Sequence, residues 1–284
     1  MEVRSVDEVD DCEIVFSALG SAAAQKVEPE LAQHGLSVVS NAAALRMHPE
    51  VPLLIPEINP DHLEMLDHQG FGTGVIVTNP NCATVGLVMS LKPLADAVGI
   101  EAVQVTTLQA ISGAGHPGVA SLDILGNALP LIPGEEDKLE TEPQKILGSV
   151  TSGAVSPAAF RISAQTNRVP VIDGHVISVS VKLGRAISTD EARAVIEDFQ
   201  SPVADLDLPS APERPVVVVD EGPRPQPRLD AARDQGMTVS VGRLRLCPVL
   251  DLRYVALVHN TERGAAGAAV LNAEFLAATG RLGS

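Results

Sequence analysis

The first eighty residues alternate short apolar runs with helix-like stretches, and this alternation constrains the fold more than any other feature. Runs rich in β-branched residues at 13–18, 36–40 and 74–78 are typical of buried strands, and the Ala-rich stretch 21–33 is typical of a helix. A Pro-containing loop over 51–61 and a short helix precede the third run. Apolar strands that alternate with helices predict a parallel sheet, so we expect an α/β domain here.

The chain beyond residue 100 has a different pattern. We expect a helix from Cys82, strands at 102–111, 176–183, 216–219, 237–246 and 252–259, and helices near 119–128, 138–147 and 263–279. These strands follow one another without regular helical crossovers, which predicts a second domain with a mixed sheet. The Pro- and Arg-rich stretch 213–228 is expected to be a rigid surface loop.

Charge and composition limit the possible partners. The 284 residues carry a formal net charge of −16 and include only six aromatic side chains, which argues against nucleic acid and against an anionic membrane surface. The start of the chain is acidic and unlike a signal peptide, and the longest uncharged stretch, 71–91, is interrupted by Asn79, Pro80 and Asn81. We therefore expect a soluble cytoplasmic protein that acts on a small molecule.

The sharpest local feature is the sequence Asn79-Pro80-Asn81-Cys82 between an expected strand and an expected helix. A cysteine in the first helical turn faces unpaired backbone N–H groups and the positive end of the helix dipole, and both favour the nucleophilic thiolate. The alternative is that Cys82 only fills a corner between strand and helix. Cys12 and Cys247 are expected to be structural.

A nucleophilic thiol needs a group that handles its proton. His175 is the best candidate because it follows Gly174 at the start of an expected strand, and His259 is a weaker one. Either histidine could instead be an ordinary surface or core residue. Residues 112–118 contain a G-x-G-x-x-G pattern, but Pro117 and the lack of a following parallel strand favour a tight glycine turn against a ligand. No pattern in the sequence predicts a metal site or a serine hydrolase.

Five ordered segments together resemble the aspartate-semialdehyde dehydrogenases of the archaeal and fungal branch. They are TNPNCATVGLVMSLKPL, TTLQAISGAGHPG, GEEDK, NRVPVIDGH and HNTERGAAGAAVLNAEFL. The resemblance implies NADP-dependent reductive dephosphorylation of aspartyl-4-phosphate to aspartate-4-semialdehyde, a step toward lysine, threonine and methionine, through a cysteine thioacyl intermediate. It also implies a homodimer or homotetramer.

The resemblance assigns roles to particular residues. Cys82 would be the nucleophile, His175 the general acid/base, and Gln109 the residue that orients the substrate. The implied substrate ligands are Arg168 for the α-carboxylate, Glu135 for the ammonium, and Lys138, Arg46 and Asn81 for the phosphate. The implied NADP-binding residues are Ser17, Ala18, Ser40, Asn41, Ser112, Gly113 and Asn260.

One departure from the family pattern is large. The family begins with a strand, a G-x-T-G-x-V-G turn and a helix that bind the cofactor diphosphate, and this sequence contains no such pattern. We therefore expect a truncated Rossmann-type NADP-binding domain over 1–81 and an α+β catalytic and dimerisation domain with a mixed sheet over 82–255. Residues 256–284 are expected to return to the first domain. A truncation, a misassigned start codon and a true loss remain open.

Two other functions remain possible at this point. Malonyl-CoA reductase shares the NPNC and GH motifs and uses an acyl-CoA thioester, although Glu135 and Lys138 favour an amino acid and a phosphate. A catalytically impaired subunit that only dimerises would also fit the missing diphosphate turn. Assays with each substrate and NADP titration would separate the three.

Overall fold

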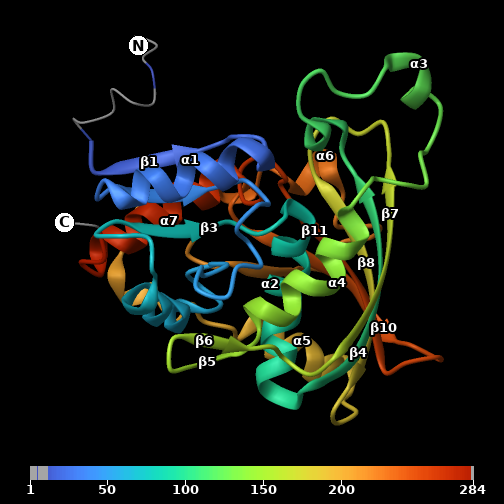
Figure 1. Cartoon of the computed structure of the whole chain (residues 1–284). Coiled ribbons are helices and arrows are strands. Elements are labelled where there is room, and N and C mark those ends of the chain that lie inside the picture. Colours follow the sequence, from blue (N-terminus) through green and yellow to red (C-terminus); the bar gives the residue numbers. More distant parts are fainter. Residues whose placement is uncertain (1–4, 6–11, 283–284) are drawn as a thin grey trace.

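The computed structural model describes residue 5 and residues 12–282, whose helices and strands are arranged around two main sheets (Figure 1). The N-terminal sheet is parallel and has the order β1 (Ile14–Ser17), β2 (Ser37–Ser40) and β3 (Val75–Thr78). Helix α1 (Ser21–Gln33) connects β1 to β2, and the 3-10 helix η2 (Pro60–His68) precedes β3. The parallel α/β unit predicted from the sequence is confirmed.

Helices from opposite ends of the chain cover the two faces of this sheet. Neighbouring residues of a strand point to opposite faces. Val38 of β2 packs in one apolar cluster with Leu31 of α1, whereas Val39 packs in another with Leu271 of α7 (Ala266–Ala278). The C-terminal helix therefore returns to the N-terminal sheet, as Figure 1 shows.

The second sheet has six strands in the order β7-β4-β8-β11-β10-β9. Their bounds are β4 (Ile100–Gln109), β7 (Arg161–Arg168), β8 (His175–Leu183), β9 (Val216–Val219), β10 (Val239–Leu246) and β11 (Leu252–Val258). Strand pairs β4–β7 and β9–β10 are parallel, and the other pairs are antiparallel. This is the mixed sheet that the absence of regular crossovers predicts.

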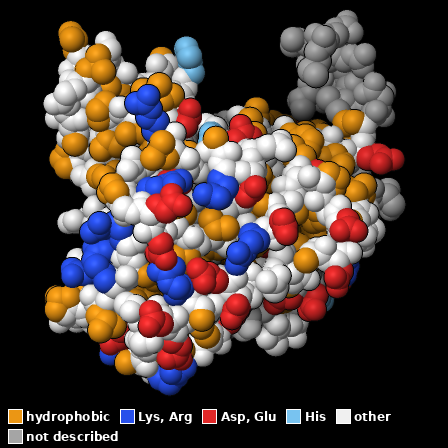
Figure 2. All heavy atoms as spheres, turned by 180° about the vertical axis from the view of Figure 1, so that it is seen from behind, with side chains coloured by type: hydrophobic (Ala, Val, Ile, Leu, Met, Phe, Trp, Pro, Cys, Tyr) orange, Lys and Arg blue, Asp and Glu red, His pale blue; other side chains and the backbone are white. Residues whose placement is uncertain are grey.

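The two faces of the second sheet differ. On one face, Val103 and Val105 belong to the main apolar core beneath helices α2 (Cys82–Val98), α4 (Glu135–Ile146) and α5 (Thr189–Glu197). On the other face, Gln104 and Ser178 are exposed. Seen from behind, several Lys and Arg side chains gather on the side of the molecule where this sheet runs (Figure 2). One face of the sheet is thus left open to solvent.

Two parts of the second unit differ from the sequence-based expectation. Instead of a helix near 119–128, the chain forms the one-turn helix α3 (Ser121–Ile124) on a loop that projects from the body (Figure 1). Leu122 there is 92% exposed and Leu125 67%, whereas Ile124 is buried, so most of this segment does not pack on the core. The sequence also did not predict β7 and α5, nor the small elements β5 (Ser149–Thr151), β6 (Ala154–Ser156) and α6 (Pro227–Asp230). No helix within the described residues is long and apolar enough to cross a lipid bilayer.

The topology brings several strand ends to one place. Strands β4 and β7 are parallel and end together, because Gln109 is paired with Arg168. Strand β8 runs the opposite way between β4 and β11, so its first residue, His175, lies at the same edge of the sheet. Helix α2, which begins at Cys82 after β3, packs against β8.

Candidate active site

The first turn of α2 is fixed by its own N-cap. Asn81 Oδ1 accepts hydrogen bonds from the N–H groups of Ala83 at 3.0 Å and Thr84 at 3.3 Å. An asparagine in this position satisfies backbone donors that the helix leaves unpaired. Cys82 is therefore held in the first helical turn, where its side chain contributes to the lining of a cavity.

Cys82 and His175 are in direct contact. The distance from Cys82 Sγ to His175 Nε2 is 3.2 Å, and the N–H of Ala110 donates a hydrogen bond to His175 Nδ1 at 3.0 Å. A ring nitrogen that accepts a hydrogen bond carries no proton, so the hydrogen-bond network assigns the proton of the neutral imidazole to Nε2. His175 thus donates its Nε2–H toward the Cys82 sulfur.

Burial dominates the protonation of this pair. Burial raises the pKa of the Cys82 thiol to about 12; the negative charge of Glu135 adds to this, while the cations Arg46 and Arg168 oppose it. Burial likewise lowers the pKa of His175 to about 3, with the neighbouring Arg168 acting in the same direction. The free protein therefore holds a thiol beside a neutral imidazole at neutral pH. The helix-terminus effect predicted from the sequence is outweighed by the partial burial of the sulfur.

Glu135 connects three of the predicted site residues. Its carboxylate accepts hydrogen bonds from Asn81 Nδ2 at 2.7 Å, Gln109 Nε2 at 3.4 Å and Lys138 Nζ at 2.6 Å. Burial alone would raise the pKa of the Glu135 carboxyl, but Lys138 and the two amides lower it below its ordinary value. A carboxylate in this environment stays charged and can receive a cationic group.

Arg168 is buried, and its Nη1 donates to the carbonyl oxygen of Ala110 at 2.7 Å. Within the described part of the chain, the guanidinium of Arg168 forms this hydrogen bond and no ion pair with a carboxylate. Ala110 therefore positions two site residues, one through its N–H and one through its carbonyl. The residue type does not indicate this role, because Ala110 acts only through its backbone.

A cavity of about 400 Å³ runs from Cys82 to the carboxyl ends of β1 and β2. The predicted residues that line it are Asn41, Arg46, Asn81, Cys82, Ser112, Gly113, Glu135, Lys138 and Asn260. Two glycines keep it open: a Cβ added at Gly113 would lie 3.0 Å from Arg168 and His175, and one at Gly264 would lie 2.6 Å from Cys82 Cβ. The glycine turn predicted at 112–118 does approach the candidate site closely.

Three predicted cofactor residues lie elsewhere. The hydroxyls of Ser17 and Ser40 are buried and both donate to Glu28 Oε1 at 2.6 Å, and neither residue lines the cavity. Ala18 is exposed at the end of β1, beside Leu19 of the cavity lining. The remaining lining offers uncharged amides, a hydroxyl and glycine backbone next to Cys82, which fits the nicotinamide half of NADP. The residues described here include no glycine-rich turn that would hold a diphosphate.

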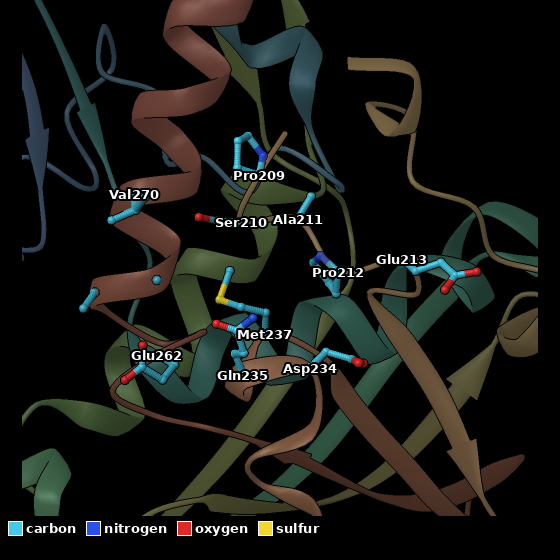
Figure 3. Close-up of a pocket in the computed structure, with 12 residues that line it drawn as sticks. Pro209, Ser210, Ala211, Pro212, Glu213, Asp234, Gln235, Met237, Glu262 and Val270 are labelled. Atoms are coloured by element: carbon cyan, nitrogen blue, oxygen red, sulfur yellow. The ribbon is translucent and has the colours of Figure 1, made fainter. Parts of the chain in front are cut away.

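A second cavity, of about 470 Å³, lies between residues 209–213, residues 234–237 and the start of α7 (Figure 3). Glu213, Asp234 and Glu262 belong to its lining, and no Lys or Arg does. Carboxylates without a neighbouring cation repel a phosphate. The cavity beside Cys82 is therefore the better candidate for an anionic substrate.

Sequence reasoning missed two buried charged residues behind the site. Glu142 Oε1 accepts from Arg46 Nη1 at 3.0 Å and Glu142 Oε2 accepts from the N–H of Asn81 at 2.7 Å. Lys145 lies one turn further along α4. Their spacing from Glu135 and Lys138 places all four on one helix face, and that stripe of charges is a signal that could have found them.

Comparisons with known proteins agree with this geometry. A family model described as "Semialdehyde dehydrogenase, dimerisation domain" matches residues 91–263, and one described as "Semialdehyde dehydrogenase, NAD binding domain" matches residues 1–66. The chain is 50% identical over 269 residues to an aspartate-semialdehyde dehydrogenase of Archaeoglobus fulgidus, covering 94% of this chain and 77% of that protein. It is 50% identical over 284 residues to that of Methanothermobacter thermautotrophicus, covering 97% and 81%. A crystal structure of aspartate-semialdehyde dehydrogenase with NADP from Candida albicans superimposes with a TM-score of 0.88 at 43% identity, covering 95% of this chain and 79% of that one.

Proposed function

This chain belongs to the aspartate-semialdehyde dehydrogenase family, and from that premise we propose that it converts aspartyl-4-phosphate to aspartate-4-semialdehyde with NADPH. The observation that carries the proposal is the 3.2 Å contact between Cys82 Sγ and His175 Nε2 beside a cavity that Glu135, Lys138 and Arg46 help to line. A thiol with a hydrogen-bond partner next to cations and a carboxylate suits covalent catalysis on an anionic amino-acid derivative.

The amino-acid part of the substrate would be held by Arg168, Glu135 and Gln109. A guanidinium can bind a carboxylate through two parallel hydrogen bonds. Arg168 donates from Nη1 to the carbonyl oxygen of Ala110, and its other N–H groups would bind the α-carboxylate of the substrate. The charged carboxylate of Glu135 would receive the α-ammonium. Gln109 shares Glu135 as a hydrogen-bond partner and would orient the acyl group.

The phosphate would be held by Arg46, Lys138 and the amide of Asn81. Arg46 lines the cavity, and its hydrogen bonds to Glu142 and Asn41 use two of its five guanidinium N–H donors, so other donors remain for an anion. Lys138 and Arg46 both line the cavity, so the leaving phosphate would be paired with two cations.

The chemistry then follows from the thiol. Cys82 Sγ attacks the acyl carbon, the bond from that carbon to the phosphate oxygen breaks, and the phosphate departs with the proton that the thiol gives up. His175 already carries a proton on Nε2, so it stabilises negative charge on Sγ by donation. When sulfur leaves again after reduction, the same Nε2–H stabilises the departing thiolate, which takes up a proton from solvent to restore the thiol. In this arrangement His175 acts on the sulfur as a hydrogen-bond donor.

NADPH, when bound, supplies the hydride that reduces the thioester carbonyl. Asn41, Ser112, Gly113 and Asn260 would hold its nicotinamide half beside Cys82. Asn260 is fixed for this by two bonds of its own, since its Oδ1 accepts from the N–H of Gly174 and its Nδ2 donates to Ser112 Oγ, each at 2.8 Å.

We also propose the domain division 1–81, 82–255 and 256–284 for these functions, and a homodimer or homotetramer. The open face of the six-stranded sheet and the projecting α3 loop support association. Besides Leu122, the residues Leu125 and Leu131 in this loop are 67% and 62% exposed, and three exposed leucines on one loop suit a contact with another protein surface. A second copy is the proposed partner.

The test is the purified chain assayed in both directions. Reduction of NADP that requires both aspartate semialdehyde and inorganic phosphate is expected, and Cys82→Ser should abolish it because a serine hydroxyl is a far weaker nucleophile at neutral pH. Oxidation of NADPH that depends on malonyl-CoA instead would favour the alternative enzyme. Calorimetric titration that detects no NADP binding would favour a catalytically impaired subunit.

A further inference from the structure

We infer that Glu142 and Lys145 are positioning residues for the phosphate end of the site, acting through Arg46 and Asn81. The inference rests on the proposed function, because it concerns how that function's phosphate ligands are held. Helix α4 presents Glu135 and Lys138 to the cavity, and Glu142 and Lys145 lie behind them on the same helix face, only 2% and 5% exposed. Buried charges of this kind are costly unless their partners are well placed.

Glu142 joins two of the proposed phosphate ligands with one carboxylate. Its Oε1 accepts from Arg46 Nη1 at 3.0 Å, and its Oε2 accepts from the backbone N–H of Asn81 at 2.7 Å. Asn81 is the N-cap of the helix that begins at Cys82. The carboxylate therefore fixes the guanidinium of Arg46 relative to the first turn of the catalytic helix.

Lys145 fixes the backbone of the segment that carries Arg46. Its Nζ donates to the carbonyl oxygens of Arg46 at 2.7 Å, His48 at 2.8 Å and Val51 at 2.7 Å. An ammonium group has three N–H donors, so all of them are used on residues 46–51. Burial lowers the pKa of Lys145 to about 8, while Glu142 opposes that shift, so the ammonium form prevails at neutral pH.

The two residues therefore hold Arg46 at both ends, its guanidinium through Glu142 and its carbonyl through Lys145. Arg46 Nη2 also donates to the carbonyl of Asn41 at 2.8 Å. A guanidinium has five N–H donors and these two bonds use two of them, so donors remain on a residue that lines the cavity. The donors of a planar guanidinium meet a phosphoryl oxygen with good geometry only if the plane is held in one orientation. The pair supplies that orientation without lining the cavity itself.

The experiment compares Glu142→Gln and Lys145→Met with the wild-type chain. Glu142→Gln keeps the side-chain shape but removes the charge that holds Arg46, and Lys145→Met removes the three donors. In the direction that consumes phosphate, both variants should raise the KM for phosphate by roughly tenfold, while the KM for aspartate semialdehyde changes by less than about twofold. A purely structural role would lower the melting temperature and leave the two KM values in their wild-type ratio.

A matched control is Glu140→Gln on the same helix, where Glu140 Oε1 accepts from the N–H of Ala164 at 2.9 Å, away from the cavity. It should leave the KM for phosphate unchanged. Calorimetric titration with inorganic phosphate gives a second readout that needs no turnover. The two hypotheses can fail separately. If the wild-type chain binds phosphate but reduces no NADP, and Glu142→Gln binds phosphate more weakly than the wild type, the inference is upheld and the proposed function is rejected. Unchanged phosphate binding in Glu142→Gln overturns the inference, as does a wild-type chain that binds no phosphate; if Lys145→Met does not fold, Glu142→Gln decides alone.

Discussion

At the scale of single residues, the state of the reactive pair is set by groups far apart in the sequence. The strand–helix junction predicts where Cys82 lies, and a glycine before a strand indicates His175 as its candidate partner. The tautomer of His175 could not be predicted, because it depends on the N–H of Ala110 at the end of β4, 65 residues away. The burial that keeps Cys82 a thiol depends in turn on the packing of both sheets.

Burial of neutral His175 predicts a loss of stability in acid. The unfolded chain takes up a proton on this histidine near pH 6.5, whereas the folded pKa is about 3, so below pH 6.5 the unfolded state binds more protons. Stability should therefore fall as pH decreases through this window. From pH 7 to pH 4, the free energy of unfolding of the wild type should drop by about 3 kcal/mol more than that of His175→Asn, which lacks the titrating group. Urea denaturation at the two pH values measures both drops. The exposed His34 provides the control, since His34→Asn should follow the wild-type curve, and equal losses in His175→Asn and wild type would contradict the prediction.

At the scale of elements, the segment between β11 and α7 carries Asn260 and Gly264 to the cavity beside Cys82. A buried ion pair holds this segment: Arg263 Nη1 and Nη2 donate to the two carboxylate oxygens of Glu57 at 2.6 and 2.7 Å. Both side chains are almost fully buried, at 1% and 0% exposure. The pair therefore fixes the entrance to α7 against the loop that follows β2.

Removing one partner of this pair should be far worse than removing both. Arg263→Met leaves a buried carboxylate without a cation, which costs about 3–5 kcal/mol, whereas the double variant Glu57→Met/Arg263→Met should recover most of that loss. Guanidinium denaturation measures both. Arg193→Met, which breaks exposed pairs with Asp220 and Glu197, should cost at most about 1 kcal/mol. An Arg263→Met chain as stable as Arg193→Met would show that the buried pair does not anchor the segment.

Strands rich in apolar residues could be predicted from the sequence, whereas elements that depend on packing against the rest of the molecule could not. The valine run of β9 and the apolar centres of the buried strands β2 and β3 match the expectation. Strand β7 was not, because it alternates buried Ala164 and Thr166 with exposed Ser163 and Gln165, and its polar sequence resembles a loop. The apolar residues near 119–128 favour a helix, but only Ile124 is buried while Leu122 and Leu125 are exposed, and only one turn forms.

At the scale of the whole molecule, the site is assembled where the N-terminal sheet meets the end of the six-stranded sheet. It draws on residues from Asn41 to Gly264, and the sequence could predict most of them only through family resemblance. Pairing of β4 with β7 and β8 cannot be deduced from periodicity, since period two fixes the faces of a strand and leaves its neighbours open. The open face of this sheet follows from the same topology.

That open face carries a feature that a second copy of the chain would explain. Arg245 and Arg253 lie directly opposite each other on β10 and β11, and like charges in such a pair destabilise a sheet. Neither forms an ion pair within the residues described here, and Arg253 Nε is buried without a partner. A chain with 36 acidic residues offers many carboxylates to this surface when two copies meet.

We therefore expect the wild-type chain to sediment at micromolar concentration with at least about twice its chain mass of 29.6 kDa. Arg253→Glu reverses the charge at a position that we expect to pair with a carboxylate of the second copy. The variant should therefore associate more weakly, and the sedimenting species should shift toward 29.6 kDa. Arg185 lies before α5 and forms an exposed ion pair with Glu191 of that helix. Arg185→Glu breaks this pair and should leave the sedimenting mass of the assembly unchanged. Moderate salt should weaken the wild-type association only in part, because apolar Leu122, Leu125 and Leu131 also contribute surface. A wild-type chain that sediments at 29.6 kDa would show that no such interface forms. An Arg253→Glu chain that associates like the wild type would show that the interface lies elsewhere.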